Sequence, residues 1–207
     1  MLTVHHLNDS RSQRILWLLE ELELPYEIKL YQRDAVTRLA PPELKAVHPL
    51  GKSPVLTCDG ATIIESGAII DHVLRHQGAG RLMPAADSAD YEAYVQWLHY
   101  AEGSAMLPLL MKMYTGMIGE GGAPLVPRID SEIANHLGYL EASLEGRDWL
   151  VGGALSGADI QMSFVGEIAG RYGLHATHPN IGAWVKRFQA RDAYKRALQK
   201  GGPYSFA

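Results

Sequence analysis

The sequence predicts an α/β part of order βαβαββα followed by an all-helical part. Two patterns carry this prediction. Up to residue 78, short runs with the alternation or apolar character of strands are interleaved with stretches of helical periodicity. From residue 88 onward the apolar residues recur at helical spacing, and no strand pattern competes with them.

The first part contains strand and helix signals in close succession. The predicted strands are residues 3–7, 26–31, 55–58 and 62–64, of which the last two form a β-hairpin around Asp59-Gly60. A first helix is predicted from the apolar face formed by Ile15, Leu18, Leu19 and Leu22, and it ends before Pro25. Residues 34–46 are ambiguous and hold at most a short helix after Pro41-Pro42. Residues 66–77 form a helix that stops at Gly78.

Residues 79–87 are predicted to link a domain of residues 1–78 to a helical domain of residues 88–207. The linker is rich in Gly, Ala and Pro. Three apolar faces mark helices in the second domain: Tyr91, Tyr94, Val95 and Leu98; Ile129, Ile133, Leu137, Leu140 and Leu144; and Ile181, Trp184, Val185 and Phe188. Ser156-Gly-Ala-Asp159 predicts a capping box at the start of a further helix.

Composition and charge narrow the class of protein. The 207 residues carry a net charge of −4, with Lys and Arg scattered, which argues against nucleic acid or an anionic membrane surface as the main partner. Cys58 is the only cysteine, so an internal disulfide and a Cys-based zinc site are excluded and a reducing, cytoplasmic location fits. We expect neither a signal peptide nor a membrane span, because long apolar runs are missing.

The segment His48-Pro-Leu-Gly-Lys-Ser-Pro-Val-Leu, with Glu65-Ser66 after it, is the most informative part of the chain. Pro54 stands before a strand, where its missing N–H is tolerated. A cis Ser53–Pro54 bond there would turn the backbone of Ser53 outward to pair with an extended peptide ligand. Glu65 and Ser66 precede a helix, where a carboxylate, a hydroxyl and free backbone N–H groups can hold a small zwitterion.

These two motifs resemble the glutathione site of the glutathione S-transferases. The N-terminal, thioredoxin-like domain of that family carries Asn-Pro-x-Gly-Lys-Val-Pro and a Glu/Gln-Ser pair. In this sequence His48 replaces the Asn and Ser53 replaces the Val. The order of an α/β part and a helical part is also that of the family, so the resemblance covers the whole chain. It implies a thioredoxin-like glutathione-binding domain, a helical domain carrying the electrophile site, and a homodimer.

The loop before the first helix is where the family places the hydroxyl that meets the glutathione sulfur. The segment Ser10-Arg-Ser-Gln-Arg-Ile-Leu-Trp-Leu-Leu resembles the serine-type bacterial and fungal transferases. Counting back from Arg14, which matches the helix arginine of the family, assigns the catalytic role to Ser10. Ser12 is the nearby alternative, and a further alternative is that both serines only cap the helix. Cysteine is absent from residues 8–14, which argues against thiol–disulfide exchange.

The remaining glutathione contacts follow from the resemblance. Lys52 would pair with the glycyl carboxylate and the Ser53 backbone with the cysteinyl part. Glu65 and Ser66 would hold the γ-glutamyl ammonium and carboxylate. The alternatives are a solvated surface lysine at position 52, and a helix cap beside a surface acid at positions 65 and 66.

A methionine-rich segment, residues 106–117, suits a pocket for varied apolar ligands because Met is flexible and polarisable. The matching helix of the family walls the second-substrate site, which here implies Met106, Met111 and Tyr114. Ordinary core packing beside Pro108 is the alternative. We expect no metal: His5-His6 and the pair His72 and His76 lack an apparent third ligand, and the zinc-protease pattern fails.

The resemblance implies a cytosolic detoxification enzyme that adds glutathione thiolate to electrophilic apolar compounds, with glutathione as co-substrate and no other cofactor. The alternatives are a non-catalytic ligand-binding or scaffold protein of the same fold, and glutathione-dependent reduction of organic peroxides. An isomerase of the maleylacetoacetate type is disfavoured, because its Ser-Ser-Cys motif is missing.

Overall fold

A four-stranded mixed sheet forms the centre of the first unit of the protein. The computed structural model describes residues 1–207. The strands lie in the spatial order β2-β1-β3-β4, with β1 (Leu2–Leu7), β2 (Tyr26–Tyr31), β3 (Val55–Cys58) and β4 (Ala61–Ile64). β1 pairs in parallel with β2 and antiparallel with β3, and β3 and β4 form the predicted hairpin. The parallel pair requires a helical crossover, which α1 (Ser12–Glu21) supplies.

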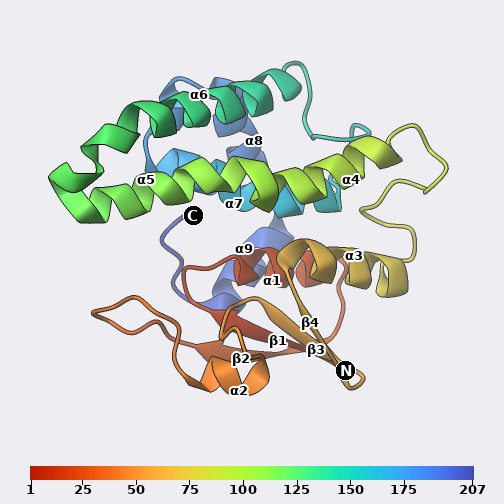
Figure 1. Cartoon of the computed structure of the whole chain (residues 1–207). Coiled ribbons are helices and arrows are strands. Elements are labelled where there is room, and N and C mark those ends of the chain that lie inside the picture. The colour runs from red at the N-terminus through yellow and green to blue at the C-terminus, as the bar shows by residue number, and fades with distance from the viewer. The chain divides into compact units, whose positions relative to one another are not determined.

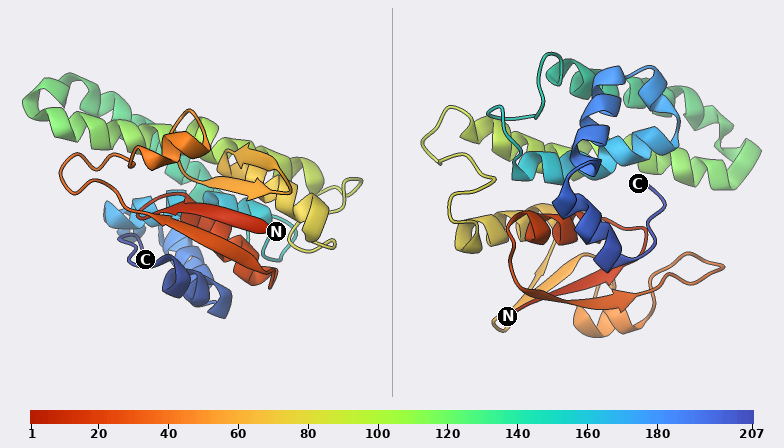
Figure 2. Two further views of the ribbon diagram at one scale, coloured as in Figure 1. Left: turned by 90° about the horizontal axis from the view of Figure 1, so that it is seen from below. Right: turned by 180° about the vertical axis from the view of Figure 1, so that it is seen from behind.

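The helices of this unit lie on both sides of the sheet (Figure 1). α1 and α3 (Ser66–Gln77) contact each other and cover one face, whereas the short α2 (Glu43–Val47) lies on the other side (Figures 1 and 2). The observed order is the predicted βαβαββα, and the short α2 resolves the ambiguity of residues 34–46. The thioredoxin-like fold of this part is therefore confirmed.

α1 is buried on nearly every side, which explains its unbroken apolar run Ile15-Leu-Trp-Leu-Leu19. All five of these side chains have 0% exposure. The sheet and α3 cover part of the helix, and α9 (Asp192–Gly201) covers another part. The ring of Trp17 lies 5.1 Å from that of Phe188 and 5.5 Å from that of Tyr194.

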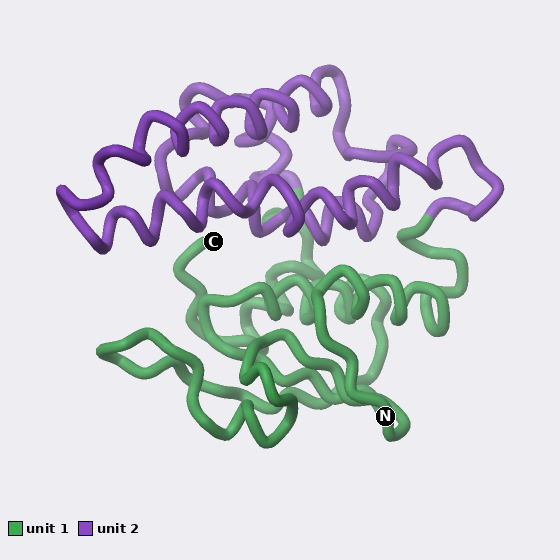
Figure 3. The backbone as a smooth tube through the Cα atoms, viewed as in Figure 1, with its two compact units in different colours: residues 1–83, 188–207 green, residues 84–187 purple.

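The last residues of the chain belong to the first unit, which differs from the predicted domain of residues 88–207. The chain divides into residues 1–83 with 188–207, and residues 84–187 (Figure 3). α9 is strongly amphipathic and buries Ala193, Tyr194 and Ala197. Ion pairs join α9 and the residue before it to α1: Arg191 with Glu21, and Arg196 and Lys200 with Glu20. The apolar face of α1 left open by the sheet is thus covered by a distant segment.

The second unit is all-helical, as predicted. Its α-helices are α4 (Tyr91–Tyr100), α5 (Met106–Ile118), α6 (Val126–Ser143), α7 (Gly157–Arg171) and α8 (Pro179–Gln189), the last two residues of which fall in the first unit. A π-helical turn, Ala101–Ala105, joins α4 to α5, and 3-10 turns occupy Gly119–Leu125 and Leu174–Ala176. None of these helices, nor any in the first unit, combines the length and apolar character needed to cross a membrane.

The predicted capping box at the start of α7 is present and extends into a buried network. Asp159 accepts hydrogen bonds from the backbone N–H groups of Ser156, at 2.9 Å, and Leu150, at 3.0 Å. The indole of Trp184 donates to the same carboxylate at 3.1 Å. Because Asp159 has 0% exposure, these donors replace the water it has lost.

Candidate functional site

The loop between β1 and α1 is held in place from three sides. Arg33 donates from its backbone N–H to Asn8 Oδ1 at 2.8 Å, and from its guanidinium to the carbonyls of Asn8, at 3.1 Å, and Asp9, at 3.2 Å. The Asp9 carboxylate accepts from Arg38 at 2.8 Å and from the backbone N–H of Ser205 at 2.8 Å. Asp9 has a φ of 49°, a left-handed conformation that Asp tolerates better than most residues.

Ser10 and Ser12 lie in contact with each other at the end of this loop. Their Oγ atoms are 2.7 Å apart, and the backbone N–H of Ser12 donates to Ser10 Oγ at 3.2 Å. Ser12 Oγ also lies 2.9 Å from His6 Nδ1 and 3.2 Å from both the N and the O of Leu7. Ser12 has 0% exposure and Ser10 has 4%. Ser10 therefore keeps more unused hydrogen-bonding capacity, on the more accessible side.

Neither serine is the N-cap of α1, since that position belongs to Arg11, which makes no side-chain cap. The first N–H groups of the helix, starting at Ser12, follow directly on Ser10. Their partial positive charge favours an anion placed beside the loop.

The segment before β3 presents its backbone next to β1. The Ser53–Pro54 peptide bond is cis, as predicted. Ser53 Oγ donates to the carbonyl of His5 at 2.8 Å and accepts from the N–H of Leu7 at 3.3 Å, while the β1–β3 ladder begins only at Val55. The side chain of Ser53 is thus tied to β1 and its backbone stays outside the ladder.

His48 performs locally what an Asn would do at this position. Its Nδ1 accepts from the N–H of Leu50 at 3.4 Å, and its carbonyl accepts from Gly51 at 2.8 Å. A side chain that accepts from the backbone two residues later is the usual reason for Asn in such a turn. Lys52 follows, exposed and without an ion pair inside the protein.

The corner between β4 and α3 has an unusual backbone at Glu65. Its φ of 65° and ψ of 119° lie where non-glycine residues are rare, and such strain clusters at ligand sites. Glu65 is exposed, whereas Ser66 is buried and accepts from Arg14 Nη1 at 3.1 Å. Arg14, with 1% exposure, thereby connects α1 to the start of α3. Sequence reasoning used Arg14 only as a marker for counting and missed this role.

Buried ionisable groups around the loop have shifted pKa values. Burial lowers the pKa of the His6 imidazole to about 4, and a hydrogen bond to the Gly201 backbone opposes this shift. For Asp9, burial alone would raise the pKa of the carboxyl, but hydrogen bonds from Ser205 and Arg38 lower it below the ordinary value. His6 is thus neutral and Asp9 charged near neutral pH.

The three residues predicted for the electrophile lie on α5 at different depths. Met106 is 2% exposed and packs in the core of the helical unit, Met111 is half-buried and Tyr114 is 57% exposed. Core packing therefore accounts for Met106. The outer face of α5 continues with Met117, 73% exposed, and Ile118, 64% exposed.

The other residues considered from the sequence have structural surroundings. Cys58 is buried in β3, and burial raises the pKa of its thiol, which leaves it protonated and unreactive. His5 and His6 point to opposite faces of β1, because successive strand residues alternate, and the Nδ1 of His5 lies 2.9 Å from the Tyr31 hydroxyl. No group of three or more His, Cys, Asp or Glu side chains is arranged to hold a metal ion.

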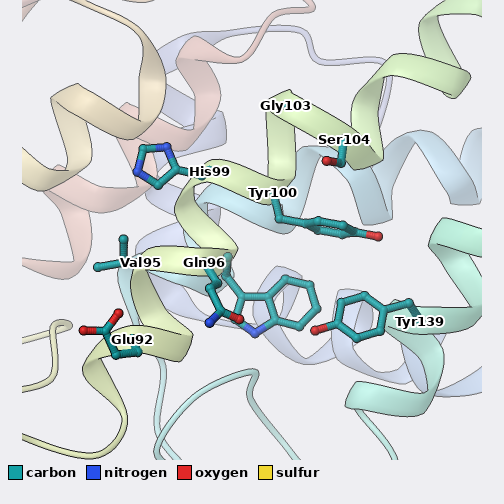
Figure 4. Close-up of a pocket in the computed structure, with 9 residues that line it drawn as sticks. Glu92, Val95, Gln96, His99, Tyr100, Gly103, Ser104 and Tyr139 are labelled. Atoms are coloured by element: carbon teal, nitrogen blue, oxygen red, sulfur yellow. The ribbon is translucent and has the colours of Figure 1, made fainter.

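The helical unit also contains an open pocket of about 510 Å³ (Figure 4). Its wall consists of residues of α4 and the π-helical turn, among them Val95, His99 and Gly103, together with Tyr139 of α6. The ring of Tyr139 stacks on that of Trp97 at 5.3 Å. The pocket includes none of the residues predicted from the sequence to contact a substrate.

Comparison with known proteins identifies the family of this chain. The family models for the N-terminal and C-terminal domains of glutathione S-transferases match residues 1–75 and 90–192. The chain is 34% identical over 215 residues to glutathione S-transferase 3 of Schizosaccharomyces pombe, covering 97% of this chain and 88% of the relative. A solved glutathione S-transferase from Actinobacillus pleuropneumoniae is 36% identical with a TM-score of 0.89, over 100% of this chain and 95% of that one. A sphingomonad glutathione S-transferase, solved in complex with glutathione, is 26% identical with a TM-score of 0.79, over 97% and 98% of the two chains.

Proposed function

This chain belongs to the glutathione S-transferase family and is a transferase, and we propose that Ser10 holds bound glutathione as its thiolate for attack on an electrophilic apolar compound. The observation that carries the proposal is the pair of serines at the start of α1. Ser10 is the more accessible and the less fully hydrogen-bonded of the two.

A thiol of pKa near 8.5 is mostly protonated at pH 7, and the thiolate is the nucleophile. A hydroxyl that donates to S⁻ stabilises the charged form by roughly 1.5–3 kcal/mol, which is about one to two pKa units. The N-terminus of α1 adds to this stabilisation. Serine acts here as a donor and needs no base, since it forms no covalent bond.

We assign glutathione to the groups that border this loop. The Ser53 backbone, outside the β1–β3 ladder, pairs with the cysteinyl part, and the exposed Lys52 meets the glycyl carboxylate. Glu65 accepts from the γ-glutamyl ammonium, and Ser66, oriented by Arg14, binds the γ-glutamyl carboxylate. Support comes from the sphingomonad relative, whose structure contains glutathione.

The electrophile is proposed to lie against the helical unit. Tyr114 and Met111 of α5 offer apolar surface to it, with Met106 buried beneath them. Flexible methionines and one aromatic ring suit substrates of varied shape.

We also propose a cytoplasmic homodimer, in which the exposed face of α3 meets residues 91–106 of the partner. The pocket of Figure 4 lies on that segment, and its lining residues all come from the helical unit. Sedimentation at micromolar concentration is expected to show a dimer, and a monomer alone would contradict this part of the proposal.

The test of function has two steps. The protein is expected to be retained on immobilised glutathione and to conjugate free glutathione to an activated aromatic halide. Retention without turnover would favour the non-catalytic alternative. Turnover of an organic hydroperoxide well above that of any halide in an electrophile panel would favour glutathione-dependent peroxide reduction.

A further inference from the structure

A network of hydrogen bonds runs inward from Ser10 through Ser12 to His6, which lies beside the end of α9. Ser10 Oγ is 2.7 Å from Ser12 Oγ, and Ser12 Oγ is 2.9 Å from His6 Nδ1. The other ring nitrogen of His6, Nε2, lies against Gly201, the last residue of α9, at 3.2 Å from where a Cβ on that glycine would be. The side chains of this network are all buried: Ser10 is 4% exposed, Ser12 0% and His6 3%.

The proton positions in this hydrogen-bond network follow from its innermost contact, the one between His6 and Gly201. Nε2 faces the Gly201 backbone, and this contact favours a protonated ring nitrogen, so we take the Gly201 carbonyl as its acceptor. That carbonyl belongs to the last turn of α9, where carbonyls lack an intrahelical partner. Since Nδ1 faces Ser12, the nitrogen that donates to Gly201 is Nε2. A neutral ring with its proton on Nε2 leaves Nδ1 as an acceptor only.

The next link is therefore also determined. Nδ1 of His6 needs a donor, and the Ser12 hydroxyl is the donor within reach. The same hydroxyl also has the Leu7 carbonyl at 3.2 Å, but Nδ1 is nearer, at 2.9 Å. Ser12 Oγ then has two lone pairs left, which accept from the N–H of Leu7 and from the hydroxyl of Ser10. The Ser12 hydroxyl thus has no hydrogen-bonding capacity left. Ser10 Oγ accepts only from the Ser12 N–H, and its own proton can leave Ser12 Oγ and donate to a ligand instead.

We propose that His6 is a positioning residue: by taking the proton of Ser12 it keeps Ser12 from donating to the glutathione sulfur and makes Ser10 the thiol donor, with Gly201 fixing the tautomer of His6. The inference rests on the proposed function of Ser10. It also has a cost for catalysis, because Ser12 Oγ competes with the thiolate for the Ser10 proton. Without an acceptor at Nδ1, the Ser12 hydroxyl is left with Ser10 Oγ at 2.7 Å and the Leu7 carbonyl at 3.2 Å, and donation to the nearer Ser10 Oγ releases the Ser10 proton to sulfur.

Two variants separate the two ring nitrogens. His6→Asn places an amide oxygen near the position of Nδ1 and keeps an acceptor for Ser12. His6→Gln places its amide near Nε2, so it keeps a donor to Gly201 and loses the acceptor for Ser12. The pKa of bound glutathione, read from thiolate absorbance, is expected to stay near the wild-type value in His6→Asn. In His6→Gln it is expected to fall by roughly half a unit to one unit, the scale of one neutral hydrogen bond.

The direction of this shift excludes a merely structural role, because a loosened loop would raise the pKa of the thiol. A double-mutant cycle adds a second criterion. In a Ser12→Ala background the two His6 variants should give the same thiol pKa, since His6 acts only through Ser12. A raised pKa in His6→Gln, or a difference between the variants that persists without Ser12, would overturn the proposal.

A measurement without glutathione tests the hydrogen-bond network of Ser10, Ser12 and His6 directly. Nitrogen NMR of the imidazole in the wild-type protein is expected to show a neutral ring with its proton on Nε2 between about pH 5 and 8. A proton on Nδ1 would refute the inference and leave the proposed function intact. Failure of the protein to bind glutathione would instead refute the proposed function. The tautomer of His6 would still show whether the hydrogen bonds from His6 to Ser12 and Ser10 run in the proposed direction.

Discussion

The loop of residues 8–12 and helix α5 are built in opposite ways. In the loop, polar atoms are buried and have fixed partners, from Arg33 and Ser205 outside it to His6 beneath it. On α5 the exposed groups are apolar: Tyr114 is 57% exposed and Met117 73%. A fixed network of polar groups suits one ligand of constant structure, whereas a flexible apolar surface accepts ligands of varied shape. On the proposed function, the difference corresponds to a constant thiol substrate and a variable electrophile.

The strongest test of this contrast removes a buried polar link near the loop. Arg14→Met should lower the free energy of unfolding by about 2–4 kcal/mol, because a hydrogen-bonded group with 1% exposure is lost and Ser66 keeps no donor. Denaturant titration measures the effect. The matched control is Arg75→Met on α3, whose exposed pair with Asp71 should be worth less than about 1 kcal/mol. An equal loss of unfolding free energy in both variants would show that buried and exposed polar groups contribute alike, which would contradict the comparison.

A second test concerns the attachment of α9, which holds Gly201 beside His6. Burial alone would raise the pKa of Glu20, but hydrogen bonds from Lys200, Tyr26 and Arg196 lower it below its ordinary value. A lowered pKa in the folded state means that the stabilisation is complete above the unfolded value of 4.5 and is lost as the pH falls below it. Glu20→Gln should therefore cost about 1–2 kcal/mol at pH 7 and progressively less below pH 4.5.

The measurement is thermal or denaturant unfolding of both proteins between pH 3 and 7. The Arg196 and Lys200 side chains are about half exposed, which limits the effect through solvent screening. A difference between wild type and variant that stays constant down to pH 3 would show that the Glu20 charge is not its source.

A smaller effect is expected at the corner between β4 and α3, where we propose that the γ-glutamyl group binds. Glu65→Gln should weaken glutathione binding by about 1 kcal/mol, or roughly fivefold, because the ammonium loses a charged partner at an exposed position. Calorimetry gives the dissociation constant directly. An unchanged constant would mean that the γ-glutamyl group is bound elsewhere. Glu27→Gln, exposed on β2, serves as the control and should leave the constant unchanged.

The smallest effect on stability is expected on α5. Tyr114→Ala should change the free energy of unfolding by no more than about 0.5 kcal/mol, since the side chain is 57% exposed. It should change KM across a panel of electrophiles while KM for glutathione stays constant. An equal change of KM for both substrates would place Tyr114 outside a separate electrophile surface.

The sequence predicted local features well because they depend on neighbouring residues. The strands, the helix over residues 66–77 and the Ser156–Asp159 capping box each follow from a short pattern. The return of α9 to the first unit was not predictable, since its apolar face fits any complementary helix. The roles of Arg14 and His6 were also missed, because both depend on contacts between residues that are distant in the sequence or that meet only through the turn. A buried arginine, or a histidine next to a serine pair, carries no pattern of its own.

The glutathione thiolate titration in Ser10→Ala and Ser12→Ala tests the central claim most directly. Absorbance of bound thiolate against pH is expected to show a pKa raised by about one to two units in Ser10→Ala, with glutathione affinity nearly unchanged. Ser12→Ala should not raise it, because on our proposal the Ser12 proton goes to His6 Nδ1, 2.9 Å away. A raised pKa in Ser12→Ala with an unaltered Ser10→Ala would reverse the assignment, and two unshifted curves would contradict the hydroxyl mechanism.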